Sequence, residues 1–119
     1  MTNEAEQMME DNLNKVWNER DPDIRSKAID KIYATEANLY HVGDQVTGLD
    51  AINRSVTNTQ KNLPQDFVFT KLKSVIINNS IGRLIWGAGP KGQPPAATGM
   101  DIAHFENGKI KSLYVFLDV

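Results

Sequence analysis

Residues 98–117 read TGMDIAHFENGKIKSLYVFL, which is two apolar, β-type runs joined by Asn107-Gly108. Asn-Gly between such runs is the strongest short-range signal for a tight hairpin, because glycine accepts the positive φ that the turn requires. Two further β-type runs precede it at 67–77 and 81–88, with Asn78-Asn79 as a turn between them. The sequence therefore predicts a C-terminal meander of four long strands.

The N-terminal half has the spacing of helices. Apolar residues recur at helical intervals over 5–17. Asp21-Pro22 ends that helix and begins another, since aspartate caps a helix and proline suits its first position. A short strand is expected over 38–42 and a third helix over 49–63. The order α-α-β-α-β-β-β-β predicts an α+β domain whose three helices pack on one face of an antiparallel sheet.

Composition narrows the classes of partner. The chain has 119 residues, which suits a single domain over 1–119, and its net charge is −2 with no basic run. We therefore expect neither nucleic acid nor a membrane surface as a partner. The chain has no cysteine, its N-terminus is acidic and unlike a signal peptide, and its apolar runs are too short to span a bilayer. A cytoplasmic location is expected.

Several short motifs occur in a recognisable order along the chain. They are Trp17, Ile32-Tyr33-Ala34, Gly48-Leu49-Asp50-Ala51-Ile52, Gly99-Met100-Asp101-Ile102 and the run from Asn107 to Phe116. Through these motifs nearly the whole chain resembles the nuclear transport factor 2-like superfamily, and within it the SnoaL-like, polyketide cyclase-like branch. The resemblance implies a cystatin-like cone with an apolar pocket between sheet and helices, often dimeric through the outer sheet face. Members include isomerases, cyclases, epoxide hydrolases, dehydratases and non-catalytic binders, so the fold does not fix the activity.

Asp101 is the leading candidate for chemistry. Strand alternation places it on the same face as Gly99, Ala103 and Phe105, which are small or apolar, so we expect this face to be the inner one. A carboxyl buried there would have a raised pKa and could act as an acid, a base or a hydrogen-bond donor. The competing interpretation is an acid that is paired structurally or faces solvent.

The resemblance also assigns expectations to His41 and Trp17. Isomerase-like relatives have a proton-abstracting aspartate at about the position of His41, a tyrosine donor where this chain has Trp17, and an acid in the position of Asp101. Histidine also transfers protons near neutral pH, although a surface histidine is an equally simple interpretation. Because two of the three positions differ, we do not expect steroid isomerase activity as such. The residues expected to line the pocket are Trp17, Tyr40, Leu84, Trp86, Leu113 and Val115.

The sequence predicts no cofactor and no metal site. The glycine-rich segment 87–92 leads into a proline turn, and it lacks the helix N-terminus that a phosphate cradle requires. The two histidines are far apart in the sequence, and no cysteine is present to complete a metal site with them.

Three functions stay open from the sequence alone. In the first, Asp101 and His41 carry out acid–base chemistry of the isomerase or cyclase kind on a small carbonyl compound. In the second, the pocket binds a small apolar molecule without turnover, and in the third the chain is a dimeric scaffold with a filled pocket. The last strand is apolar on both faces, with Tyr114 and Phe116 on one of them, so we expect a homodimer that covers the outer face.

Overall fold

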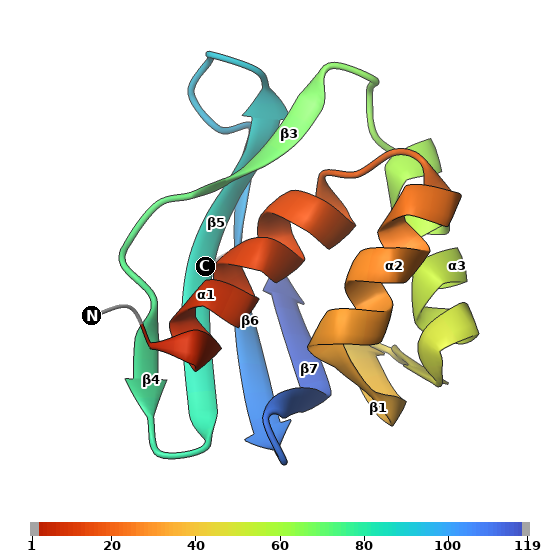
Figure 1. Ribbon diagram of the computed structural model, residues 1–119. Helices are drawn as coiled ribbons and strands as arrows, with labels where there is room; N and C mark the ends of the chain where they lie inside the picture. Colours follow the sequence, from red (N-terminus) through yellow and green to blue (C-terminus); the bar gives the residue numbers. More distant parts are fainter. Residues whose placement is uncertain (1–2, 118–119) are drawn as a thin grey trace.

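The structure, a computed structural model, describes residues 3–117 and consists of helices packed on a seven-stranded sheet (Figure 1). The helical segments are α1 (Glu4–Asp11), the π-helical η1 (Asn12–Trp17), α2 (Pro22–Ile32) and α3 (Leu49–Lys61). The strands are β1 (Tyr33–His41), β2 (Asp44–Thr47), β3 (Phe67–Lys71), β4 (Ile76–Asn78), β5 (Ile81–Pro90), β6 (Ala97–Glu106) and β7 (Lys109–Leu117). The sheet order is β2-β1-β7-β6-β5-β3, and β4 also pairs with β5. The predicted α+β class is confirmed.

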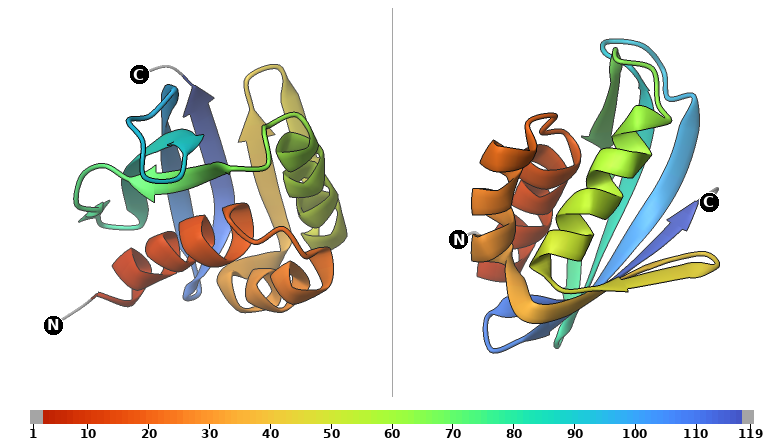
Figure 2. Two further views of the ribbon diagram at one scale, coloured as in Figure 1. Left: turned by 90° about the horizontal axis from the view of Figure 1, so that it is seen from above. Right: turned by 90° about the vertical axis from the view of Figure 1, so that its right-hand side faces the viewer.

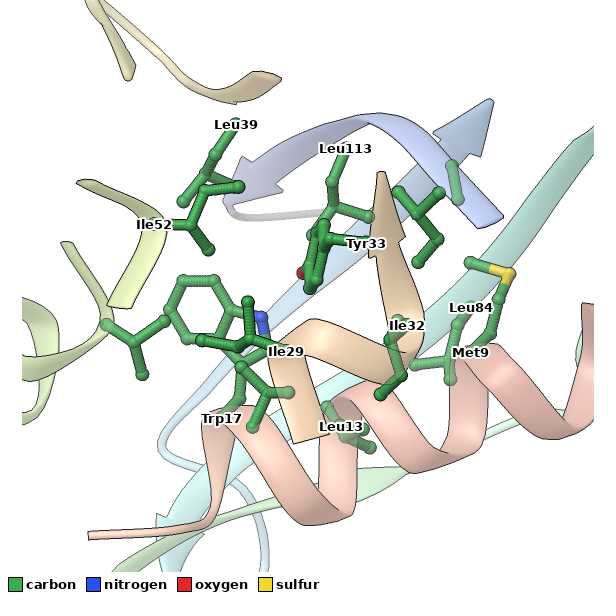
Figure 3. Close-up of a cluster of buried hydrophobic side chains, with 14 of the residues drawn as sticks. Met9, Leu13, Trp17, Ile29, Ile32, Tyr33, Leu39, Ile52, Leu84 and Leu113 are labelled. Carbon is green, nitrogen blue, oxygen red and sulfur yellow. The ribbon is translucent and has the colours of Figure 1, made fainter. Parts of the chain in front are cut away.

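The helices all cover one face of the curved sheet, which we call the inner face (Figure 2). The opposite, outer face carries no helix of residues 3–117. Helical side chains meet inner-face side chains in a single core that includes Met9, Leu13, Trp17, Ile29, Ile32, Tyr33, Leu39, Ile52, Leu84 and Leu113 (Figure 3). No helix of the described chain is long and apolar enough to cross a membrane.

Local sequence signals account for the helix boundaries. The side chain of Asp21 accepts the N–H of Asp23 at 2.8 Å, and Pro22 is the first residue of α2, as predicted. The first helix runs on into η1, where the N–H of Asn18 donates to the carbonyl of Leu13, five residues earlier, at 3.0 Å. This π-helical turn was not predicted, and such turns are frequent at functional sites.

The hairpin between β6 and β7 forms at Asn107-Gly108, as the sequence predicts. Both residues have positive φ, 54° at Asn107 and 79° at Gly108, which is the geometry of a type I′ turn. Glu106 and Lys109 face each other on either side of it. The register changes by one residue beyond the turn, where β6 takes one step from Phe105 to His104 and β7 takes two between their partners, and Asp101 then pairs with Val115.

Several features of the sheet differ from the prediction. Strand β1 begins at Tyr33, before the predicted range 38–42, and strand β2, which pairs with its second half, was not predicted. The run 67–77 is two strands, because the chain takes five steps from Lys71 to Ile76 while β5 takes three between their partners Trp86 and Arg83. The two surplus residues cannot join the ladder, so the strand is interrupted. Finally, β1 and β7 are parallel, so the sheet is mostly and not wholly antiparallel.

The β6–β7 turn can be tested by Gly108→Val. Valine at a φ of 79° is strained, so we expect a loss of stability of about 1 kcal/mol or more. Asn107→Gly, which keeps positive φ accessible, is the matched control and should leave the melting temperature nearly unchanged. An unaltered melting temperature for Gly108→Val would contradict the assigned turn.

Candidate functional site

A cavity of about 440 Å³ lies between η1, the end of α3 and the inner face of the sheet. Its wall is mostly apolar, and His41 and Asp101 are the only titratable residues of the described chain that line it. Its aromatic members, His41 aside, are Trp17, Phe67, Phe69 and Trp86. Residues 3–117 contain no cluster of three or more His, Asp or Glu side chains placed to hold a metal ion.

Asp101 occupies the inner face of β6 and is only 4% exposed. Its Oδ1 accepts the indole N–H of Trp86 at 2.9 Å. Among residues 3–117 it has no cationic partner and no second hydrogen bond. Burial raises the pKa of the Asp101 carboxyl to about 7, and the bond from Trp86 opposes this rise only in part. Both protonation states are therefore populated near neutral pH.

The raised pKa of Asp101 has a consequence for stability. A folded pKa of about 7 lies above the ordinary value of 3.8, so the proton is held more tightly in the folded chain. The resulting stabilisation is fully present below about pH 3.8 and is lost as the pH rises through about 7. The full loss is roughly 4 kcal/mol. Because ionisation of this carboxyl costs stability, we infer that it has a functional role and not a structural one.

Trp86 reaches Asp101 because Gly99 leaves room for its ring. Trp86 and Gly99 are direct partners across β5 and β6, and Asp101 is two residues further along β6 on the same face. A Cβ built on Gly99 would lie 2.1 Å from Cζ2 of Trp86. The indole therefore lies across the glycine, with its N–H directed along β6 to the carboxyl.

His41 ends β1 at the edge of the same cavity. Its Nε2 lies 3.2 Å from Oγ of Ser55 on α3, and its ring contacts that of Trp17 edge-on, with centroids 6.0 Å apart. Burial lowers the pKa of His41, against the opposing effect of Asp44, so the ring is neutral at pH 7. No hydrogen bond joins His41 to Asp101, although the structure places both in one cavity wall.

Three of the six residues expected in the wall lie there, namely Trp17, Trp86 and Val115. The other three lie elsewhere. Tyr40 is on the outer face, where it stacks on Tyr114 with ring centroids 4.5 Å apart and an interplanar angle of 8°. Leu84 and Leu113 are within the core, 1% and 0% exposed. Alternation along β1 explains Tyr40, since its neighbours Leu39 and His41 are the inward residues.

A second buried polar group, missed by the sequence analysis, is close enough to Asp101 to be affected by its charge. The hydroxyl of Tyr33 donates to Oδ1 of Asn12 at 2.5 Å, and both residues are buried. Burial, with a contribution from Asp101, raises the pKa of the Tyr33 phenol, which is therefore uncharged. The indole nitrogen of Trp17 is directed toward this hydroxyl (Figure 3) and opposes the rise in the phenol pKa, although it makes no hydrogen bond of ordinary geometry within residues 3–117. Asn12 is the first residue of the π-helical segment, and its burial on the core side of that segment brings its amide to the Tyr33 hydroxyl.

The phenylalanine side of the wall is held by Asn18. Its Nδ2 donates to the carbonyl of Phe69 at 2.8 Å, and its Oδ1 accepts the N–H of Phe69 at 2.7 Å. Asn18 therefore pairs with both backbone groups of Phe69, as a residue of a neighbouring strand would, and these two bonds hold β3 against the end of η1. Arg20 adds longer bonds to the carbonyls of Gln60, Pro64 and Phe67. No local sequence signal predicts these long-range contacts.

No protein-family model and no curated protein matches the sequence. Solved structures do match in three dimensions. A SnoaL-like family protein from Agrobacterium tumefaciens, provisionally named an isomerase, superposes with a TM-score of 0.86 at 19% identity, over 95% of this chain and 96% of that one. A SnoaL-like protein from a Jannaschia species, provisionally named a polyketide cyclase, gives 0.80 at 9% identity, over 97% and 85%.

A third match is a protein with a ketosteroid isomerase-like fold from Catenulispora acidiphila, solved in complex with trimethylamine. It superposes with a TM-score of 0.73 at 14% identity, over 95% of this chain and 86% of that one. At such identities the likeness establishes architecture and not activity. The chain therefore has the nuclear transport factor 2-like fold, as its sequence motifs implied, and its structural neighbours include SnoaL-like proteins.

Proposed function

We propose that this protein binds a small, mostly apolar carbonyl compound and transfers protons on it through Asp101. The observation that carries the proposal is a carboxyl with a pKa of about 7 in the wall of an apolar cavity of about 440 Å³. Such a cavity has the size of an ordinary small-molecule site. A pKa near the working pH suits a general acid or base.

The geometry supports different roles for the two titratable groups, with Asp101 as the hydrogen-bond donor and His41 as the proton acceptor. Oδ1 of Asp101 is held by Trp86, which leaves Oδ2 as the oxygen that can meet a ligand. In its protonated state this carboxyl can donate to a carbonyl oxygen and stabilise the negative charge that develops there. Neutral His41 can accept the proton released from the neighbouring carbon, and Ser55 orients its ring.

The comparisons support a reaction of the isomerase or cyclase kind. Two of the structural neighbours carry provisional names of these classes, and a third holds a small molecule, trimethylamine. The alternative is a non-catalytic binding module in which Asp101 only orients the ligand. The absence of a hydrogen bond between Asp101 and His41, noted above, favours this alternative. An open cavity argues against the scaffold with a filled pocket.

Proton transfer can be measured without knowing the substrate. We expect the protein to accelerate exchange of the α-hydrogens of cyclohexanone in D2O, followed by NMR. Asp101→Asn, which keeps the shape of the side chain but cannot act as an acid or a base near neutral pH, should lower the rate about 100-fold or more. His41→Gln should also slow it, whereas Asp66→Asn, at an exposed acid outside the cavity wall, should not. No acceleration by the wild-type protein, or an unchanged rate in Asp101→Asn, would contradict the catalytic proposal and favour the binding module.

We also propose that the protein is a homodimer that buries the outer face. Tyr114 and Phe116 are 40% and 45% exposed on this face, beside Ile102 and Met100 in the register of β6 and β7. The stacked Tyr40 widens the apolar surface further. A second copy of the same face would cover these side chains in an isologous contact.

Light scattering at tens of micromolar should give the mass of a dimer. Tyr114→Glu places an unpaired charge in the proposed contact and should yield a folded monomer. Lys61→Glu, at an exposed position on α3, is the control and should leave the dimer intact. A monomeric wild-type protein would rule the dimer out.

A further inference from the structure

Four aromatic rings in the cavity wall form a continuous chain of perpendicular contacts. His41 meets Trp17 at an interplanar angle of 77°, Trp17 meets Phe69 at 74°, and Phe69 meets Trp86 at 85°. The three centroid distances lie between 5.4 and 6.1 Å. Rings that turn by about a right angle at each step enclose a space on several sides. The cavity is therefore a box with aromatic walls, to which Phe67 adds a further ring.

The box contains one carboxyl and no cation. Asp101 is joined to the last ring of the chain by the bond from Trp86, and no lysine or arginine lines the cavity or pairs with the carboxyl within residues 3–117. Buried carboxylates in proteins are ordinarily accompanied by a positive partner. Residues 3–117 supply no positive partner for Asp101, so a cationic ligand could take that place.

Aromatic faces and a carboxylate together attract one class of ligand. The negative face of an aromatic ring attracts a cation, tryptophan most strongly, and several rings around one site are how proteins recognise alkylammonium groups. We infer that the aromatic box binds small alkylammonium ions, held by the rings of Trp17, Phe69 and Trp86 and by the ionised carboxylate of Asp101. This inference goes beyond the proposed function, because it assigns a second ligand class to the ionised state of the same cavity.

The proton on Asp101 decides which ligand class binds. A neutral carbonyl compound needs a donor, so it binds the protonated carboxyl and its binding weakens as the pH rises through the carboxyl pKa. A cation needs the carboxylate, so its binding strengthens over the same range and releases a proton from Asp101 below that pH. With a pKa of about 7, the switch lies within the physiological range.

The other groups around Asp101 do not change charge in a way that mimics this switch. From β1, the Tyr33 phenol is uncharged because burial raises its pKa, and His41 is neutral near pH 7 because burial lowers its pKa. Trp86 on β5 and the side chains of η1 and β7 that line the cavity carry no charge. Protonation of His41 at low pH would repel a cation, so a variant at His41 belongs in the test.

Choline and its uncharged isostere 3,3-dimethylbutan-1-ol separate charge from shape. In calorimetric titrations at pH 8, we expect choline to bind at least about tenfold more tightly than the alcohol. Its affinity should fall roughly tenfold per pH unit below the carboxyl pKa, while the alcohol changes little. At pH 6, titrations in two buffers of different ionisation enthalpy should show release of about one proton per choline bound.

Variants assign the effect to the box. Asp101→Asn should remove the pH dependence and the preference for choline, whereas Asp66→Asn should keep both. Phe69→Leu should weaken choline more than the alcohol, and Phe105→Leu, at a partly buried aromatic outside the cavity, should not. His41→Gln should retain the proton release, since the proton comes from Asp101.

Equal affinities for choline and the alcohol, or choline binding without proton release, would overturn the inference. These two measurements use only the wild-type protein, so they stand even where a variant fails to fold. The proposed carbonyl chemistry is tested by a separate experiment, the exchange of cyclohexanone hydrogens, which involves no cation. Loss of exchange with retention of proton-linked choline binding would refute that function and leave this inference in place.

Discussion

The hydrogen bond from Trp86 to Asp101 is the interaction on which the site depends. It exists because Gly99 has no side chain, which allows the indole to lie across β6 and reach the carboxyl at 2.9 Å. The same ring forms part of the cavity wall and contacts Phe69. One bond thus fixes the carboxyl, leaves its second oxygen available, and places an aromatic face beside it. The carboxyl in turn opposes folding when it ionises, so the rest of the core supplies the stability that it removes.

The fold and the inward position of Asp101 follow from signals that are local in the sequence. Asn107-Gly108 adopts positive φ at two successive residues, which forms the tight turn and pairs the residues beside it. Alternation along β6 then decides which of its residues face the helices, although the one-residue shift against β7 at His104 has no local signal. The start of α2 is likewise set by a local signal, because the capping bond of Asp21 is to the nearby N–H of Asp23.

The wall of the cavity depends on contacts between distant residues, and these could not be predicted. The π-helical segment Asn12–Trp17 has no sequence signature, and Asn18 bonds to Phe69 across 51 positions of the chain. The interruption between β3 and β4 follows from a mismatch in length against β5 and not from any breaker residue. The inward direction of β1 was ambiguous because its apolar and aromatic residues occupy both faces, which is why Tyr40 was assigned to the pocket.

The central claim is that Asp101 is a buried carboxyl poised between its two protonation states at neutral pH. The most direct test is a carbon-detected NMR titration of the Asp101 carboxyl from pH 4 to 9, with Asp101→Asn used to assign the signal. We expect a midpoint near 7. A midpoint at or below about 4, the value of an ordinary aspartate, would contradict it and identify the group as a solvated or ion-paired acid.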